Sequence, residues 1–232
     1  MIESLPAYPL DYVSVLVSVQ DRGRPLYQGT AFPFLRPGLW LTAAHCVRNW
    51  RGPDTLALVQ TGPGNVGIDS ITRVETHPGL DLGVLTSASL AAVPFPEVGY
   101  GQWGNEVSVV GYPEDLFLDA DGRDRPRARL LKGHIQRVEQ PGPEADREGD
   151  FELSFACPGG LSGSPVVLQG GRQVIGVVIG NRDSAVTEHV SEEVVTDGKT
   201  SRTEIQRAVS FGSAVDLSRA AAWLAKYSSW GV

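Results

Sequence analysis

Cysteine is scarce in this sequence, and long apolar runs are missing. Only two cysteines, Cys46 and Cys157, occur among 232 residues. Secreted domains usually carry more, so we expect two free thiols in a reducing, cytoplasmic setting rather than a disulfide. No run approaches the roughly 20 apolar residues of a membrane span. The opening segment, MIESLPAYPL, lacks the basic region and cleavage site of a signal peptide. These absences argue against a membrane or secreted protein.

Positive charge is also in short supply. The sequence has 20 Lys and Arg residues against 27 Asp and Glu residues, a formal net charge of −7 at pH 7. Because no basic block occurs, neither nucleic acid nor an anionic membrane is expected as a partner. Its 4 histidines and 2 cysteines form no cluster with metal-ligand spacing. We therefore expect no metal and no other cofactor.

Helical periodicity is confined to one segment near the end of the chain. There, Asp216 has the position of an N-cap, and the apolar residues of 217–227 share one helical face. Elsewhere the pattern is that of short strands. In YVSVLVSV every second residue from Val13 to Val19 is valine, which predicts a strand with one strongly buried face. Further strands are predicted at residues 55–59, 71–74, 82–85, 107–111, 151–155, 165–168 and 174–180. Many short strands separated by turn-rich segments predict an all-β barrel or sandwich.

A break between two halves is predicted at residues 91–106. The segment AAVPFPEVGYGQWGNE contains proline and glycine and has no periodicity, as is typical of a linker. The N-terminal half then covers residues 10–95 and the C-terminal half residues 104–217, with the helix at 216–228.

The turn CPGGLSGSPVV has the composition expected around a nucleophilic serine. Glycines surround Ser162 and allow backbone N–H groups to face a ligand, so the N–H groups of Gly160 and Ser162 are candidate donors to an oxyanion. Ser164 precedes a proline and a strand, and we rank it second as nucleophile. Taken alone, the stretch is more typical of a plain glycine-rich turn than of a catalytic site. The orientation of the Gly159–Gly160 peptide stays open.

A serine nucleophile needs a neutral imidazole to take its proton and a carboxylate to orient that imidazole. His45 stands in LTAAHCV, between small residues and a cysteine. Asp81 stands in THPGLDLGVL, directly before an apolar strand, where burial begins and an acid needs a partner. Considered separately, His45 could be a histidine packed in the core, and Asp81 could be an acid that caps the start of a strand.

These three segments resemble the catalytic segments of the trypsin/chymotrypsin family of serine proteases. They occur in the family's order of histidine, aspartate and serine, and the resemblance extends from about Val13 to Leu224. Among the branches of the family, the bacterial high-temperature-requirement proteases and glutamyl endopeptidases are the most similar. The resemblance implies an all-β fold of two antiparallel six-stranded barrels and a C-terminal helix. It also implies that His45 is the general base, Asp81 orients it, and Ser162 attacks a protein or peptide substrate.

The resemblance also indicates a specificity pocket. The residues that it implies are Ala156, Ile179, Gly180, Asn181 and Ser210. Because alanine at the floor carries no charge, no strong preference for Arg or Lys before the cleaved bond is expected, unless Asp183 or Glu188 supplies the charge. Beside the pocket, an insertion at residues 182–208 contains an Asp-Gly pair at 197–198, which predicts a hairpin overhanging the pocket.

Other functions fit parts of the pattern. A protease fold without activity would serve as a binding module, but such proteins usually lack one of the three catalytic residues, and all three are present. An esterase of the α/β-hydrolase class would need the order Ser, Asp, His and alternating helices. We therefore favour an active endopeptidase. An active cytoplasmic protease needs control, so a regulatory or sensor protein is an expected partner, and an effector role in a bacterial conflict system is a hypothesis.

Overall fold

Strands make up most of the described structure. The computed structural model describes residues 13–18, 26–53, 55–62, 65–88, 96–114, 127–139, 150–170, 173–195 and 199–228. Within these ranges, helical structure is confined to short 3-10 helices and one α-helix near the C-terminal end. The predicted all-β class with a single closing helix therefore agrees with the structure.

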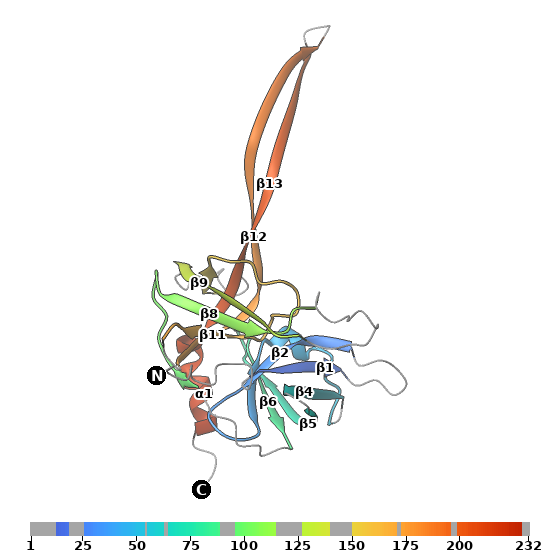
Figure 1. The fold of residues 1–232 in the computed structure, drawn as a ribbon, viewed down its shortest axis with the longest axis vertical. Coiled ribbons are helices and arrows are strands. Elements are labelled where there is room, and N and C mark those ends of the chain that lie inside the picture. Colours follow the sequence, from blue (N-terminus) through green and yellow to red (C-terminus); the bar gives the residue numbers. More distant parts are fainter. Residues whose placement is uncertain are drawn as a thin grey trace, which may run out of the picture.

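The first half of the chain forms a closed barrel of six strands (Figure 1). Its elements are β1 (Ser14–Ser18), β2 (Leu26–Pro33), β3 (Leu39–Thr42), the 3-10 helix η2 (Ala44–Val47), β4 (Leu56–Gly62), β5 (Asn65–Thr76) and β6 (Gly83–Ser87). The strands pair in the order β1-β2-β3-β6-β5-β4, and every pair is antiparallel. The barrel predicted for this half is confirmed.

Strand β1 is buried on both faces, although its alternating sequence pattern predicts only one buried face. Val15 and Val17 pack into a cluster that also contains residues of the second half, such as Tyr112. Leu16, on the opposite face, packs into a separate cluster with Leu58 and other barrel residues. The strand thus lies between the interior of the barrel and the second half of the molecule, so both of its faces are covered.

The second half is a seven-stranded sheet in which six strands form a closed ring of pairings, and a six-stranded barrel is predicted for it. Its elements are β7 (Glu97–Val98), β8 (Glu106–Gly111), β9 (Arg129–Val138), β10 (Phe151–Leu153), β11 (Pro165–Leu168), β12 (Gln173–Val195), β13 (Lys199–Asp216), the 3-10 helix η5 (Leu217–Ala220) and α1 (Ala221–Ser228). The strand order is β11-β8-β9-β10-β13-β12-β7, and β11 also pairs with β12. The additional strand, β7, comes from the predicted linker and pairs in parallel with the start of β12. Its backbone groups thereby gain partners that a free linker would lack.

The predicted N-cap, Asp216, caps the 3-10 helix η5, which continues directly into α1 at Ala221. The Asp216 carboxylate accepts a hydrogen bond from the Ser218 N–H at 2.8 Å. Asp150, whose side chain is 4% exposed, accepts the backbone N–H of Asp216 at 2.7 Å and forms an ion pair with Arg219. A buried carboxylate needs such partners. Because Asp150 directly precedes β10, this cluster ties the helix to the sheet.

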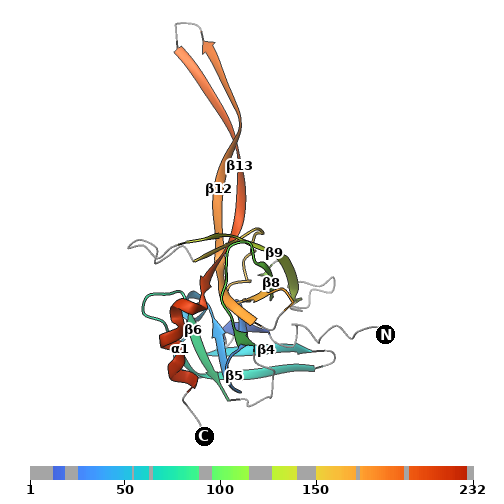
Figure 2. The same ribbon diagram turned by 90° about the vertical axis from the view of Figure 1, so that its left-hand side faces the viewer.

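Strands β12 and β13 extend beyond the sheet as a two-stranded ribbon that projects far from the body (Figures 1 and 2). They stay paired from Gly176 opposite Asp216 to Val195 opposite Lys199. The expected hairpin is therefore present, but it extends outward and does not fold over the pocket. The pairing explains the direction, since the hairpin prolongs two core strands and stays paired through two register shifts, at Val178/Gly180 and Thr187/His189. Residues 196–198, with the predicted Asp-Gly turn, lie outside the described residues.

Both thiols have the predicted state. Cys46 and Cys157 are free and buried. Burial raises the pKa of the Cys157 thiol to about 12, so this sulfur stays protonated at neutral pH and is a poor nucleophile. Among the residues that the structure describes, no helix has the length and apolar character needed to cross a bilayer.

Candidate active site

His45 and Asp81 meet beside two paired strands of the barrel. The helix η2, which carries His45, follows β3, and Asp81 lies two residues before β6. Since Thr42 pairs with Gly83, the two side chains emerge at the same edge. Asp81 accepts the His45 backbone N–H on Oδ1 at 2.8 Å and contacts the ring Nδ1 through Oδ2 at 2.6 Å. This two-point contact orients the imidazole, holds its proton on Nδ1 and leaves Nε2 as the proton acceptor.

The two side chains change each other's proton affinity. The hydrogen bond to Asp81 is the largest effect that holds the pKa of His45 above its usual range, and burial partly opposes it. Burial raises the pKa of the Asp81 carboxyl, but the hydrogen bond and charge of His45 outweigh burial and hold that pKa below its usual range. The pair therefore favours an ionised carboxylate and a basic imidazole, as a general base requires.

Ser162 is the accessible serine of its turn. Ser164 is 0% exposed, whereas Ser162 is partly exposed. The backbone of Ser164 is part of the sheet, since its N–H donates to the Leu161 carbonyl and its carbonyl accepts from the Val178 N–H, both at 2.9 Å. Of the two serines, Ser162 is therefore the one that a substrate can reach.

The Ser162 segment docks against the barrel next to His45. The Thr30 N–H donates to the Ser162 carbonyl at 2.8 Å. The Cys46 thiol lies 3.7 Å from the same oxygen, although Cys46 and Ser162 are 116 residues apart in sequence. Gly29 makes this approach possible, because a Cβ there would lie 2.6 Å from the Cys46 Sγ and 2.8 Å from the Ser162 oxygen. The segments that carry the serine and the histidine are thus brought side by side.

The hydroxyl of Ser162 itself is not bonded to His45 in this structure. No hydrogen bond joins these two side chains among the described contacts. Such bonds are often long before substrate binds, and they tighten in the substrate complex. The backbone contacts above therefore carry the evidence that the two segments belong to one site.

The turn before Ser162 presents two unused N–H groups. The Gly159 carbonyl accepts from the Glu114 N–H at 2.8 Å, so the N–H of Gly160, on the other side of the same planar peptide, points away from Glu114. In the described part of the chain, neither the Gly160 N–H nor the Ser162 N–H has an acceptor. Gly160 has φ +96°, a conformation that favours glycine. The arrangement suits two donors to one oxyanion.

Side chains of the barrel strand β2 contact the carbonyl side of this turn. The Gly160 carbonyl lies 2.5 Å from the Tyr27 hydroxyl and 3.1 Å from the Thr30 hydroxyl. The single proton of the Tyr27 hydroxyl is shared between this carbonyl and that of Tyr112, which lies next to the same hydroxyl. Burial raises the pKa of Tyr27, so its hydroxyl stays protonated and can donate. Sequence reasoning missed Tyr27, Thr30 and Gly29. The available signal was a glycine inside a strand, which often marks a close backbone approach.

The predicted pocket floor is flanked by both strands of the ribbon. Ala156 is exposed, and the Asn181 side chain accepts the N–H of the next residue, Cys157, at 2.6 Å. From β13, the Gly212 N–H donates to the Phe155 carbonyl at 2.6 Å. Strands β12 and β13 therefore border Ala156 from two sides, close to where the resemblance expects the walls.

The remaining pocket residues divide between the barrel and the ribbon. Ile179 packs against the barrel cluster that contains Cys46. Gly180 has φ +148°, and a Cβ there would meet nothing within 4 Å. The Ser210 hydroxyl lies on the ribbon, 2.6 Å from the Asp183 carboxylate, and Glu188 faces an arginine across the ribbon at 3.6 Å. Glu188 is thus paired with a cation, whereas Asp183 contacts only the neutral hydroxyl of Ser210, itself one of the predicted pocket residues.

Solved structures with the same fold are proteases. The chain resembles the MamO protease domain from Magnetospirillum magneticum (apo form), with a TM-score of 0.61 at 15% identity over 92% of this chain and 96% of that one. It resembles the active form of the Rv3671c protease from M. tuberculosis, with a TM-score of 0.60 at 22% identity over 93% and 80% of the two chains. The HtrA-type protease AlgW with decapeptide gives a TM-score of 0.62 at 14% identity, over 94% of this chain and 64% of that chain. At such identities the likeness concerns the fold.

Sequence comparison is more specific about the family. No curated protein sequence matches the chain. The family described as "Trypsin-like peptidase domain" matches residues 29–177, more than half of the chain. The match begins at Gly29, where the Ser162 segment packs against the barrel, and it includes the His45–Asp81 pair and the Ser162 turn. The chain therefore belongs to the family of trypsin-like peptidase domains.

Proposed function

We propose that this protein is a serine endopeptidase that cleaves peptide bonds through an acyl-enzyme. The Ser162 Oγ attacks the peptide carbonyl carbon while its proton passes to His45 Nε2, and Asp81 stabilises the resulting imidazolium. The N–H groups of Gly160 and Ser162 bind the tetrahedral oxyanion. The intermediate collapses, the C–N bond breaks, and His45 gives its proton to the leaving amine. A water molecule, deprotonated by His45, then attacks the acyl group and releases the carboxylic acid and free Ser162.

The two-point contact between His45 and Asp81 carries this proposal. A carboxylate that bonds both the backbone and the ring of one histidine fixes a particular tautomer, which a histidine buried only for packing would not need. The docking of the Ser162 carbonyl on Thr30, next to Cys46, adds the nucleophile to the same site. The unused N–H groups of Gly160 and Ser162 support the same chemistry.

The proposed substrate is an extended protein or peptide segment. One structural neighbour, AlgW, was solved with a decapeptide. In this chain the uncharged Ala156 and the Asn181 amide at the pocket support a preference for uncharged side chains before the cleaved bond. No strong selection of Arg or Lys is expected from the uncharged Ala156 or from Glu188, which pairs with Arg207. Asp183 is bonded to the neutral Ser210 and is the acid that would have to supply charge if such a selection were observed.

We further propose that the chain works as one protease unit. Residues 10–95 supply His45 and Asp81, residues 104–217 form the second barrel and supply Ser162, and residues 216–228 close the unit. The two free, buried thiols support a reducing, cytoplasmic setting. Control by a regulatory or sensor protein and a role in a bacterial conflict system stay predictions.

Labelling with a fluorophosphonate tests the proposed mechanism directly. The reagent phosphonylates a serine only when a base and an oxyanion site activate it. We expect one label per chain, located on Ser162 by peptide mass spectrometry, and no label on Ser162→Ala. Absence of label on the wild-type protein at any pH would favour the inactive binding module over the endopeptidase.

A second prediction concerns Gly29, which allows the Ser162 segment to pack closely against the barrel. Gly29→Ala is expected to slow fluorophosphonate labelling by about 10²-fold, since displacing a reacting group by about 1 Å has effects of this size. The added Cβ would push the Ser162 carbonyl and the Cys46 thiol apart. Labelling rates are measured with excess reagent, and circular dichroism checks the fold.

Gly52→Ala is the matched control for that variant. Gly52 also has a positive φ, +136°, but a Cβ there would meet nothing within 4 Å. It therefore adds similar backbone strain without crowding the site, and near wild-type labelling is expected. Equal losses in the two variants would argue that strain, and not the Ser162 contact, is responsible.

A further inference from the structure

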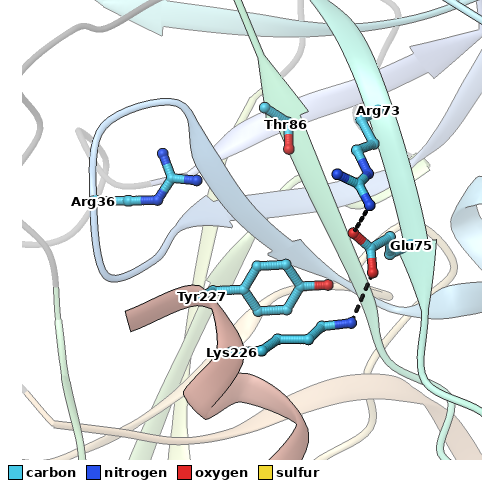
Figure 3. Close-up of a pocket in the computed structure, with 6 residues that line it drawn as sticks. All are labelled: Arg36, Arg73, Glu75, Thr86, Lys226 and Tyr227. Carbon is cyan, nitrogen blue, oxygen red and sulfur yellow. Dashed lines mark hydrogen bonds and ion pairs between the residues drawn. The ribbon is translucent and has the colours of Figure 1, made fainter. Parts of the chain in front are cut away.

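Another pocket lies where the C-terminal helix packs beside β5 and β6 (Figure 3). Its volume is about 290 Å³. The residues that line it are Arg36, Arg73, Glu75, Thr86, Lys226 and Tyr227. They come from the turn between β2 and β3, from the two strands and from α1, so tertiary folding alone assembles the pocket.

Positive charge dominates this pocket in a protein of net charge −7. Three cationic side chains face one carboxylate, Glu75. Both oxygens of Glu75 already have partners, since Oε1 lies 2.7 Å from Arg73 Nη2 and Oε2 lies 2.7 Å from Lys226 Nζ. After the negative charge of Glu75 is subtracted, the three cationic side chains leave the pocket with an excess of two positive charges.

Arg36 has a polar atom without a partner in this pocket. Its Nε is buried and forms no hydrogen bond with any described residue. Figure 3 shows the Arg36 guanidinium directed into the space that Tyr227 borders. A buried donor without an acceptor is costly, and the cost is greatest when the group is charged. An anionic acceptor in the pocket would remove that cost.

Lys226 is held in place before any ligand arrives. Its ammonium lies 4.8 Å from the ring centre of Trp223 and 4.7 Å from that of Tyr227, in addition to its pairing with Glu75. Cation–π contacts of this kind restrain a flexible lysine. The pocket is thus preorganised, which lowers the entropic cost of binding.

We propose that this pocket binds a small organic oxyanion, with its carboxylate or phosphate group between Arg36, Arg73 and Lys226. Guanidinium groups suit both anions, because their paired N–H donors match two oxygens. The volume is near the lower end of known ligand pockets, about 300–1,000 Å³, so the ligand is small. The inference is independent of the proposed peptidase activity.

The pocket has a structural connection to the candidate active site. Strand β5, which carries Arg73 and Glu75, runs directly into the loop that holds Asp81. On the same helix as Lys226, Trp223 packs edge-to-face on His77 of that loop, with ring centres 5.2 Å apart. A ligand in the pocket would therefore contact both β5 and α1, the two elements that adjoin the Asp81 loop.

Binding is tested on the full chain by calorimetric titration and thermal unfolding. Sodium phosphate and sodium succinate are the two probes, and sodium chloride at equal ionic strength is the control. We expect saturable binding of at least one probe, with a rise in Tm of about 5 °C near saturation. Preference for phosphate or for succinate identifies the anionic group. Failure of both probes to bind saturably would overturn the proposal.

Variants locate the bound anion. Arg36→Ala is expected to weaken binding at least about 10-fold, as loss of a charged hydrogen bond does. Arg73→Ala, at a side chain that is 57% exposed and so tolerant of change, serves as a second variant. Arg202→Ala removes an equally exposed arginine from the ribbon, 58% exposed, and should bind as the wild type does. Equal affinity of the Arg36 and Arg73 variants and the wild type would place the anion elsewhere and refute this site.

Discussion

Ser162→Ala is expected to lower kcat for peptide hydrolysis by about 10⁶-fold, with little change in KM. The variant removes the only accessible hydroxyl of the turn and keeps the backbone N–H groups that bind the oxyanion. Residual catalysis of about 10³–10⁴-fold over water is therefore expected from oxyanion and substrate binding. The measurement is steady-state hydrolysis of a peptide selected from a library digest, with mass spectrometry to identify the cleaved bond.

Ser164→Ala is the control for this prediction. Ser164 stands in the same turn, but its side chain is completely buried and its hydroxyl has no hydrogen-bond partner among the described residues. Removing that hydroxyl should leave kcat within a few-fold of the wild type. A large loss in Ser164→Ala together with an active Ser162→Ala would show that the nucleophile is wrongly assigned.

Asp81→Asn is expected to lower kcat by about 10⁴-fold while the protein stays folded. An asparagine amide at this position would place an N–H group opposite the ring and favour the His45 tautomer whose Nε2 carries the proton. That tautomer cannot accept the proton of Ser162. Asp183→Asn, at an exposed carboxylate on the ribbon, is the matched control and should retain activity. Equal activity of the two variants would contradict the proposed role of Asp81.

The pH profile provides an independent readout of the same pair. Only the neutral imidazole accepts the serine proton, so activity should rise with pH through the pKa of His45. The hydrogen bond to Asp81 raises that pKa, so the midpoint in the wild type should lie above the ordinary histidine value of about 6.5. In Asp81→Asn the midpoint should move down toward that value. An unchanged midpoint would indicate that another group limits activity.

Local patterns were sufficient to predict several parts of this protein. Alternating valines predicted β1, and Asp216 before a helical apolar face predicted the start of the C-terminal helix, because both depend on neighbours within a few residues. The candidate residues His45, Asp81 and Ser162 were proposed because their three segments occur together in the order of the trypsin/chymotrypsin family. The structure adds the contact between His45 and Asp81 and the docking of the Ser162 segment.

Other features depend on contacts between segments that are distant in sequence. The support of the Gly160 carbonyl by Tyr27 links residues 133 apart, and no periodicity records such a pair. The outward direction of the ribbon follows from its two strands prolonging β12 and β13 of the sheet, whereas the Asp-Gly pair predicts only that a hairpin turn is present. The cationic pocket joins a turn, two strands and the helix. These parts follow from packing, since the sequence specifies which residues must be buried or paired but not which distant residue covers each of them.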